Sequence, residues 1–171
     1  GITIQNNDFK FPIWGMLEKI ADILLAGVPA LVKPATISSY VTEAMFRDII
    51  ASGILPEGAV QLLVGSAHGI LDHVQSQDVV TFTGSASTGH QLKGHPRIIS
   101  EAVPFNLEAD SLNCSILGED AKPGTEEFDL FIKEVRKEMT LKCGQRCTGI
   151  RRAIVPAHLL EDVQIALGKA L

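Results

Sequence analysis

The run VVTFTGSASTG, residues 79 to 89, decides the fold class of this 171-residue chain. Its first part is a continuous apolar run bounded by glycine, which is typical of a strand buried on both faces of a sheet. Gly84 allows the backbone to turn sharply into a helix, whose first amide groups suit an anion or a pyrophosphate. Because the run lacks the GxGxxG pattern, it is by itself a weak indication of nucleotide binding.

Extended and helical patterns alternate upstream of this run. The expected strands are short apolar runs at residues 2–5, 30–33 and 60–65. The expected helices cover residues 13–27 and 39–53, and residues 69–74 form one or two further helical turns. Ser38 or Ser39 can cap the second helix, and the 60–65 run is expected to be buried on both faces. This alternation predicts an α/β fold with a doubly wound parallel sheet.

The pattern changes at residues 102–118, where extended segments follow one another directly. Thr125 is expected to cap a helix that has Glu126 and Glu127 in its first turn. A strand at 153–156 and a helix over the last residues complete the second part. The change of pattern predicts two domains, residues 1–109 and residues 110–171.

Composition excludes several function classes. The net charge is −5 and no basic stripe occurs, so a nucleic-acid partner is not expected. No apolar run reaches the length of a membrane-spanning helix. Hydrophobic residues make up 46% of the chain, which indicates surface that contacts another domain or subunit, and we expect a homo-oligomer. Three cysteines at low density suit a reducing cytoplasm.

The stretch LKCGQRCTGIRR, residues 141–152, places Cys143 and Cys147 four positions apart. A structural zinc site needs further paired ligands, and none matches, so no metal site is expected. The histidines are scattered, at His68, His73, His90, His95 and His158. Buried apolar packing is the common fate of a free cysteine, and it is the interpretation that suits Cys114 and Cys143.

Cys147 suits that interpretation poorly, because polar residues surround it and glycines loosen the backbone on both sides. The nearby Arg146, Arg151 and Arg152 favour a thiolate. Local features alone leave a reactive and a structural Cys147 equally open.

Two charged residues are further candidates. Glu108 ends an apolar run near the domain boundary, and it is either a solvated edge residue or a carboxyl group suited to general base catalysis. Lys33 directly follows a buried strand, at the sheet edge where α/β proteins bind ligands. It is either a surface lysine or a contact to a phosphate or ribose.

Six motifs together resemble those of the aldehyde dehydrogenase superfamily. They are FxFP at 9–12, VKPA at 32–35, PEGxV at 56–60, FTGS at 82–85, LEAD at 107–110 and GQRCTG at 144–149. Within the superfamily the chain is similar to the dehydrogenase part of the bifunctional phenylacetate-degradation proteins. The resemblance implies a partial Rossmann-like cofactor domain followed by the first part of a catalytic domain. It also implies NADP-dependent oxidation of an aldehyde, with a CoA-linked semialdehyde as the expected substrate.

The resemblance also implies roles for individual residues. Cys147 matches the nucleophile and Glu108 the general base that activates water for thioester hydrolysis. The matching cofactor contacts are Lys33, Thr36, Ser66, Gly84 and Ser85. At the Thr36 position a glutamate would bind the ribose 2′-OH and repel a 2′-phosphate, so threonine favours NADP, with NAD as the alternative.

Lys10 departs from the superfamily pattern, since it stands where an asparagine amide helps to hold the oxyanion. Losing one such donor costs about 10²–10³ in kcat. The lysine either substitutes as a donor or pairs with the thiolate and misplaces it. One alternative function is therefore a catalytically impaired nucleotide-binding protein. A second alternative within the superfamily is a CoA-acylating aldehyde dehydrogenase, and Glu108 argues against it, because those relatives lack the general-base glutamate.

Overall fold

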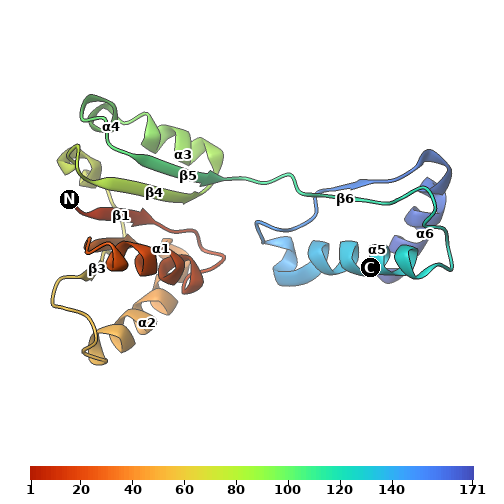
Figure 1. Ribbon diagram of the computed structural model, residues 1–171, viewed down its shortest axis with the longest axis horizontal. Coiled ribbons are helices and arrows are strands. Elements are labelled where there is room, and N and C mark those ends of the chain that lie inside the picture. The colour runs from red at the N-terminus through yellow and green to blue at the C-terminus, as the bar shows by residue number, and fades with distance from the viewer. The chain divides into compact units, whose positions relative to one another are not determined.

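The protein, described as a computed structural model over residues 1–171, divides into two units, Gly1–Asp110 and Ser111–Leu171 (Figure 1). Each unit has its own hydrophobic core. None of the helices could cross a lipid bilayer.

A five-stranded parallel sheet forms the centre of the first unit, with the strand order β3-β2-β1-β4-β5. The strands are β1 (Thr3–Asn6), β2 (Ala30–Lys33), β3 (Val60–Leu62), β4 (Val79–Gly84) and β5 (Phe105–Ala109). The helices are α1 (Trp14–Leu25), α2 (Ser39–Ala51), α3 (Ala86–Lys93) and α4 (Pro96–Ser100), with short 3₁₀ turns η1 (Thr36–Ser38) and η2 (Ile70–His73). The predicted doubly wound α/β fold is confirmed.

Helices cover both faces of this sheet (Figure 1). On one face, α1 and α2 pack on β2 and β3 around the buried residues Met16, Ile20 and Val32. On the opposite face, Ile4 and Val80 pack with residues of η2 and α4. β1 and β4 thus supply the core on this face, whereas β2 and β3 supply the core under α1 and α2.

Two local expectations for this unit are wrong. The 60–65 run forms only a three-residue strand at the sheet edge, and only one of its faces is buried, because Val60 and Leu62 pack in the core while Gln61, on the other face, is exposed. Neither Ser38 nor Ser39 caps α2 through its side chain. Ser39 instead donates a hydrogen bond to the carbonyl of Thr36, since a 3₁₀ turn leads directly into the helix.

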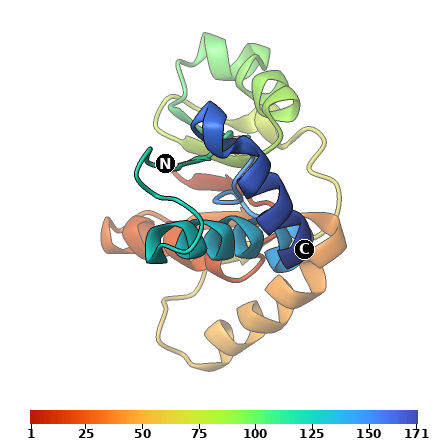
Figure 2. The ribbon, with the colours of Figure 1, turned by 90° about the vertical axis from the view of Figure 1, so that its right-hand side faces the viewer.

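The second unit pairs two parallel strands with two helices that cross one another (Figure 2). Its elements are β6 (Cys114–Ile116), α5 (Glu126–Thr140), β7 (Arg152–Ile154) and α6 (Leu160–Ala170), with 3₁₀ turns η3 (Leu141–Gly144) and η4 (Ala157–Leu159). The Thr125 cap is confirmed, because its side chain accepts a hydrogen bond from the amide of Phe128. The apolar face of α5 forms the core together with Val163 of α6.

Candidate functional site

The strand order creates a switch point between β1 and β4, because the chain runs outward from β1 to β2 and β3 and then returns to β4 on the other side. In open α/β sheets, ligands bind at such a point, beyond the carboxyl ends of the strands. The five strands end at this edge, at Asn6, Lys33, Leu62, Gly84 and Ala109. The sequence therefore brings the first-unit candidates to one edge of one sheet.

The turn from β4 into α3 is tightly packed. A side-chain Cβ on Gly84 would lie 2.6 Å from the ring of Phe82, so only glycine fits there without a shift. Phe82 is buried, and its ring lies against Gly84 and Gly89. Ser85 caps α3, because its hydroxyl accepts a hydrogen bond from the amide of Thr88. The exposed start of α3 thus presents further backbone amides at the switch point.

The other predicted cofactor residues lie at the end of β2 or just beyond the ends of β2 and β3. Lys33 is the last residue of β2, and its ammonium donates to the carbonyl oxygen of Pro34 at 3.0 Å. Thr36 is exposed at the start of η1. Ser66 is exposed after β3, and its hydroxyl accepts a hydrogen bond from the amide of His68 at 3.3 Å. These side chains all lie on the same edge as Gly84.

Lys19 is a site residue that the sequence analysis missed. Its ammonium donates to Thr83 Oγ1 at 2.7 Å and to Asn7 Oδ1 at 3.2 Å. Burial lowers the pKa of Lys19, and the nearby carboxylates, of which Glu108 is the strongest, oppose that shift. The sequence did carry a signal for Lys19, because this lysine falls on the same helix face as the apolar residues Met16 and Ile20.

Glu108 is exposed on β5, directly beside Thr83 of β4 in the strand register. The carboxylate therefore lies next to the Lys19–Thr83 pair. Lys10 follows β1, and its ammonium lies 3.4 Å from a carboxylate oxygen of Asp8. Glu108, Lys10 and the predicted cofactor residues belong to the first unit, whereas Cys147 belongs to the second.

Cys147 lies in an irregular segment after α5. Lys142 and Cys143 both have left-handed backbone angles, with φ of 52° and 57°, and Gly144 continues this turn at 71°. Left-handed geometry costs a non-glycine residue roughly 1–2 kcal/mol, and such strain concentrates at functional sites. The Arg151 guanidinium closes the turn by donating to the carbonyl of Gly144 at 2.8 Å.

Asn113, just before β6, anchors the same segment from the other side. Its side-chain amide donates to the carbonyl oxygens of Cys147 and Gly149. Its own carbonyl accepts hydrogen bonds from the amides of Arg151 and Arg152, at 2.9 and 3.2 Å. Asn113 thus fixes the backbone from Cys147 to Arg152 through its side-chain amide and its own carbonyl.

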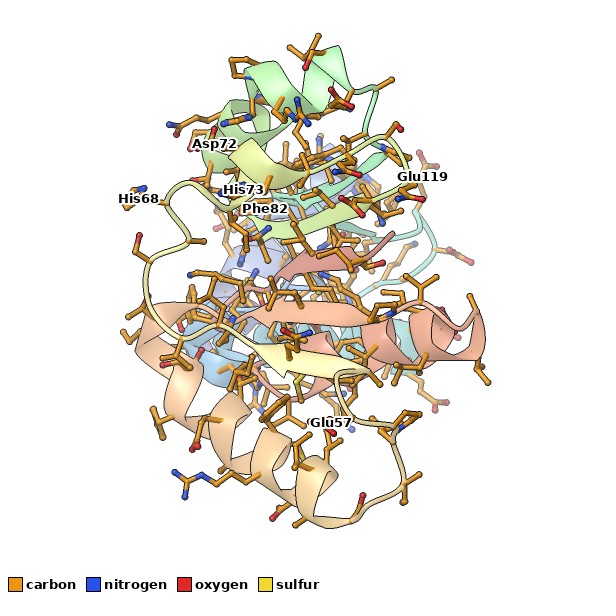
Figure 3. All side chains as sticks on the ribbon, turned by 90° about the vertical axis from the view of Figure 1, so that its left-hand side faces the viewer. Glu57, His68, Asp72, His73, Phe82 and Glu119 are labelled. Carbon is orange, nitrogen blue, oxygen red and sulfur yellow. The ribbon has the colours of Figure 1, made fainter.

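Two expectations about the other cysteines are wrong, because Cys114 and Cys143 are exposed rather than buried, and Cys147 is half-buried. Strand alternation turns Leu117 toward the core and therefore turns Cys114 outward. The left-handed turn takes Cys143 off the packed face of α5. No group of three or more histidine, cysteine, aspartate or glutamate side chains could hold a metal ion, and His68 points away from the sheet (Figure 3).

Comparison with known proteins gives a consistent result. The model of the aldehyde dehydrogenase family matches residues 4–171. The 3,4-dehydroadipyl-CoA semialdehyde dehydrogenase of Aromatoleum evansii is 50% identical over 157 residues, which are 92% of this chain and 30% of that protein. The chain therefore spans about 30% of the length of this curated relative.

Two solved structures are similar over 99% of this chain. The NADP-dependent glyceraldehyde-3-phosphate dehydrogenase of Bacillus halodurans, complexed with NADP, is 26% identical with a TM-score of 0.82, and 34% of its chain is covered. The succinic semialdehyde dehydrogenase of Streptococcus pyogenes, in complex with NADP⁺, is 20% identical with a TM-score of 0.85, and 36% of its chain is covered. The second likeness supports the fold alone.

Proposed function

Because the chain belongs to the aldehyde dehydrogenase family, we propose that it carries the nucleophile and much of the cofactor site of an NADP-dependent aldehyde dehydrogenase. Residues 1–109 form part of the NADP-binding domain, and residues 110–171 begin the catalytic domain. The substrate is a CoA-linked semialdehyde, as in the degradation of phenylacetate. The 50% identity to the Aromatoleum enzyme supports this choice of substrate class.

The residues at the sheet edge suit a dinucleotide. The amides at the start of α3 suit the pyrophosphate, and Gly84 leaves no side chain between the turn and a ligand. Lys33 supplies a cation at the end of β2, and Thr36 adds no negative charge beside it. A ribose 2′-phosphate gains a charge-assisted contact from such a lysine, so NADP is favoured over NAD.

The chemistry requires two residues of this chain. The Cys147 thiolate attacks the aldehyde carbon, forming a C–S bond and a thiohemiacetal. A dinucleotide held at the sheet edge would supply the hydride acceptor for this carbon, and Cys147 would then carry the acyl group as a thioester. Glu108 then takes a proton from water, which attacks the thioester carbonyl and releases the carboxylic acid and the thiolate.

The observation that carries the proposal is the placement of Glu108. Its carboxylate lies beside a partly buried ammonium, Lys19, at the switch point of the sheet. A carboxylate at this edge is suited to act where the cofactor and the substrate meet.

The test uses the Cys147→Ala variant, with Cys143→Ala as the control because Cys143 is an exposed thiol in the same segment. NADPH fluorescence is followed in a single turnover with a CoA-linked semialdehyde, and the thioester on the protein is detected by mass spectrometry. We expect Cys147→Ala to lose both signals and Cys143→Ala to keep them. NADP binding without either signal in the unmodified chain would instead support a catalytically impaired nucleotide-binding protein, as the Lys10 substitution suggests.

A further inference from the structure

Side chains, more than backbone pairing, hold the segment that contains Cys147. Up to Gly149 the backbone after α5 forms short turn contacts, such as Gln145 N–H to Lys142 C=O at 3.0 Å and Gly149 N–H to Arg146 C=O at 3.3 Å, and its amides bond a distant backbone carbonyl, that of Asn113, only from Arg151 onward. The left-handed residues before Cys147 make this path unfavourable for a free chain. Some other contact must therefore keep the segment in one conformation.

Glu138, in the last two turns of α5, makes contacts of this kind. One carboxylate oxygen accepts a hydrogen bond from the Arg146 guanidinium at 3.0 Å. The other accepts from the Thr148 hydroxyl at 3.3 Å. Arg146 and Thr148 are the two residues on either side of Cys147, so one carboxylate holds both neighbours of the thiol to a helix.

This ion pair differs from the surface pairs of the same helix. The Glu138 and Arg146 side chains are 18% and 22% exposed, whereas Glu134 and Lys137, one turn earlier, are 40% and 52% exposed. Exposed pairs of that kind contribute little to stability. A half-buried, charge-assisted hydrogen bond is screened less by solvent and is stronger than an exposed one, so the Glu138 contact is the one that can fix a loop.

We propose that Glu138 is a positioning residue for Cys147, a role that rests on the function proposed above. It acts through Arg146 and Thr148, while Asn113 fixes the backbone carbonyls of Cys147 and Gly149 from the β6 side. The ion pair with Glu138 holds the Arg146 guanidinium at the end of α5. Releasing Glu138 frees the side chains on both sides of the thiol.

The first test is amide hydrogen exchange of the full chain. Glu138→Ala should accelerate exchange at residues 145–149 by about tenfold, the equivalent of one lost hydrogen bond to a charged group. Glu138→Gln keeps an acceptor for Thr148 and loses the charge, so its exchange rate at these residues should fall between those of the wild type and Glu138→Ala. Glu134→Ala removes the exposed pair of the same helix and should change nothing. Unaltered exchange at 145–149, or faster exchange throughout residues 111–171, would overturn the proposal.

The second test separates positioning from stability. Glu138→Ala should lower kcat for aldehyde oxidation about tenfold or more while leaving the KM for NADP unchanged, and Glu138→Gln should restore part of the loss. A KM effect with kcat preserved would contradict a role at Cys147. Should Cys147→Ala remain active, the proposed function fails, whereas the exchange experiment still decides whether Glu138 holds the segment.

Discussion

Lys19 on α1 donates a hydrogen bond to Thr83 on β4, with 2.7 Å between Nζ and Oγ1. Thr83 lies directly beside Glu108 in the pairing of β4 and β5. The partly buried Lys19 ammonium thus connects α1 to the β4–β5 strand pair, and β5 carries Glu108, the proposed base. This relationship makes stability depend on pH in a defined direction.

Replacing Lys19 with methionine tests that direction. Burial lowers the pKa of Lys19 from its usual 10.5, so in the window below 10.5 the unfolded chain binds more protons than the folded chain. Stability must then rise with pH across the window. Relative to Lys19→Met, the wild type should gain stability between about pH 7 and about pH 10. Urea unfolding of both proteins at the two pH values measures this gain. The same difference in unfolding free energy at both pH values would contradict the burial of the charge.

Glu108→Gln should separate the two halves of the proposed reaction. Glutamine cannot take a proton from water, so the thioester should form but not hydrolyse. A burst of NADPH with little subsequent turnover is expected in pre-steady-state fluorescence. If burst and turnover fall equally, Glu108 acts through structure instead. The Glu101→Gln variant, at a partly exposed carboxylate that pairs with Arg97, supplies a comparison within the same unit.

Thr36→Glu should reduce the preference for NADP. A carboxylate at the start of η1 would repel a 2′-phosphate that Lys33 otherwise attracts. The wild type should bind NADP more tightly than NAD by about 1–3 kcal/mol, and the variant should narrow or reverse that difference. Titration of both cofactors measures it, with Thr36→Ser as the control. NAD binding as tight as NADP in the wild type would mean that the phosphate is not recognised here.

Thr125→Ala should destabilise the second unit through the loss of a helix cap. The Thr125 hydroxyl accepts a hydrogen bond from the Phe128 amide and donates to the Lys122 carbonyl at 2.8 Å. Losing such a cap costs about 1 kcal/mol. Thermal unfolding should show the loss in Thr125→Ala and little change in Thr125→Ser. Equal stability of all three proteins would show that the acidic first turn alone starts α5.

Self-association is expected for this chain in solution. Large apolar side chains are exposed on both units, among them Leu25, Ile54 and Ile116. The strands β3 and β5 also leave unpaired sheet edges, and such edges associate readily. Light scattering across a concentration series should show species larger than a monomer. A monomer at every concentration would contradict this prediction and remove support for the expected homo-oligomer.

The elements with strong periodicity were predictable from sequence, and the contacts between distant residues were not. The glycine-bounded run that became β4 and the cap at Thr125 depend on neighbours within a few positions. Lys19 escaped detection because its partner Thr83 is 64 positions away. Cys114 and Cys143 were misjudged because their exposure depends on strand alternation and on a left-handed turn, neither of which is visible in composition.

The position of β1 at the centre of the sheet has a consequence for synthesis. β1 pairs with β2 on one side and with β4 on the other, and Thr3 faces Val79, which is translated 76 residues later. At ribosomal rates of about 5–20 residues per second, the strand waits roughly 4–15 s for its second neighbour. During that interval Ile4 and Gln5, both fully enclosed in the finished molecule, face water or a chaperone. The nascent chain is thus most vulnerable to misfolding before the segment that decides its fold has emerged.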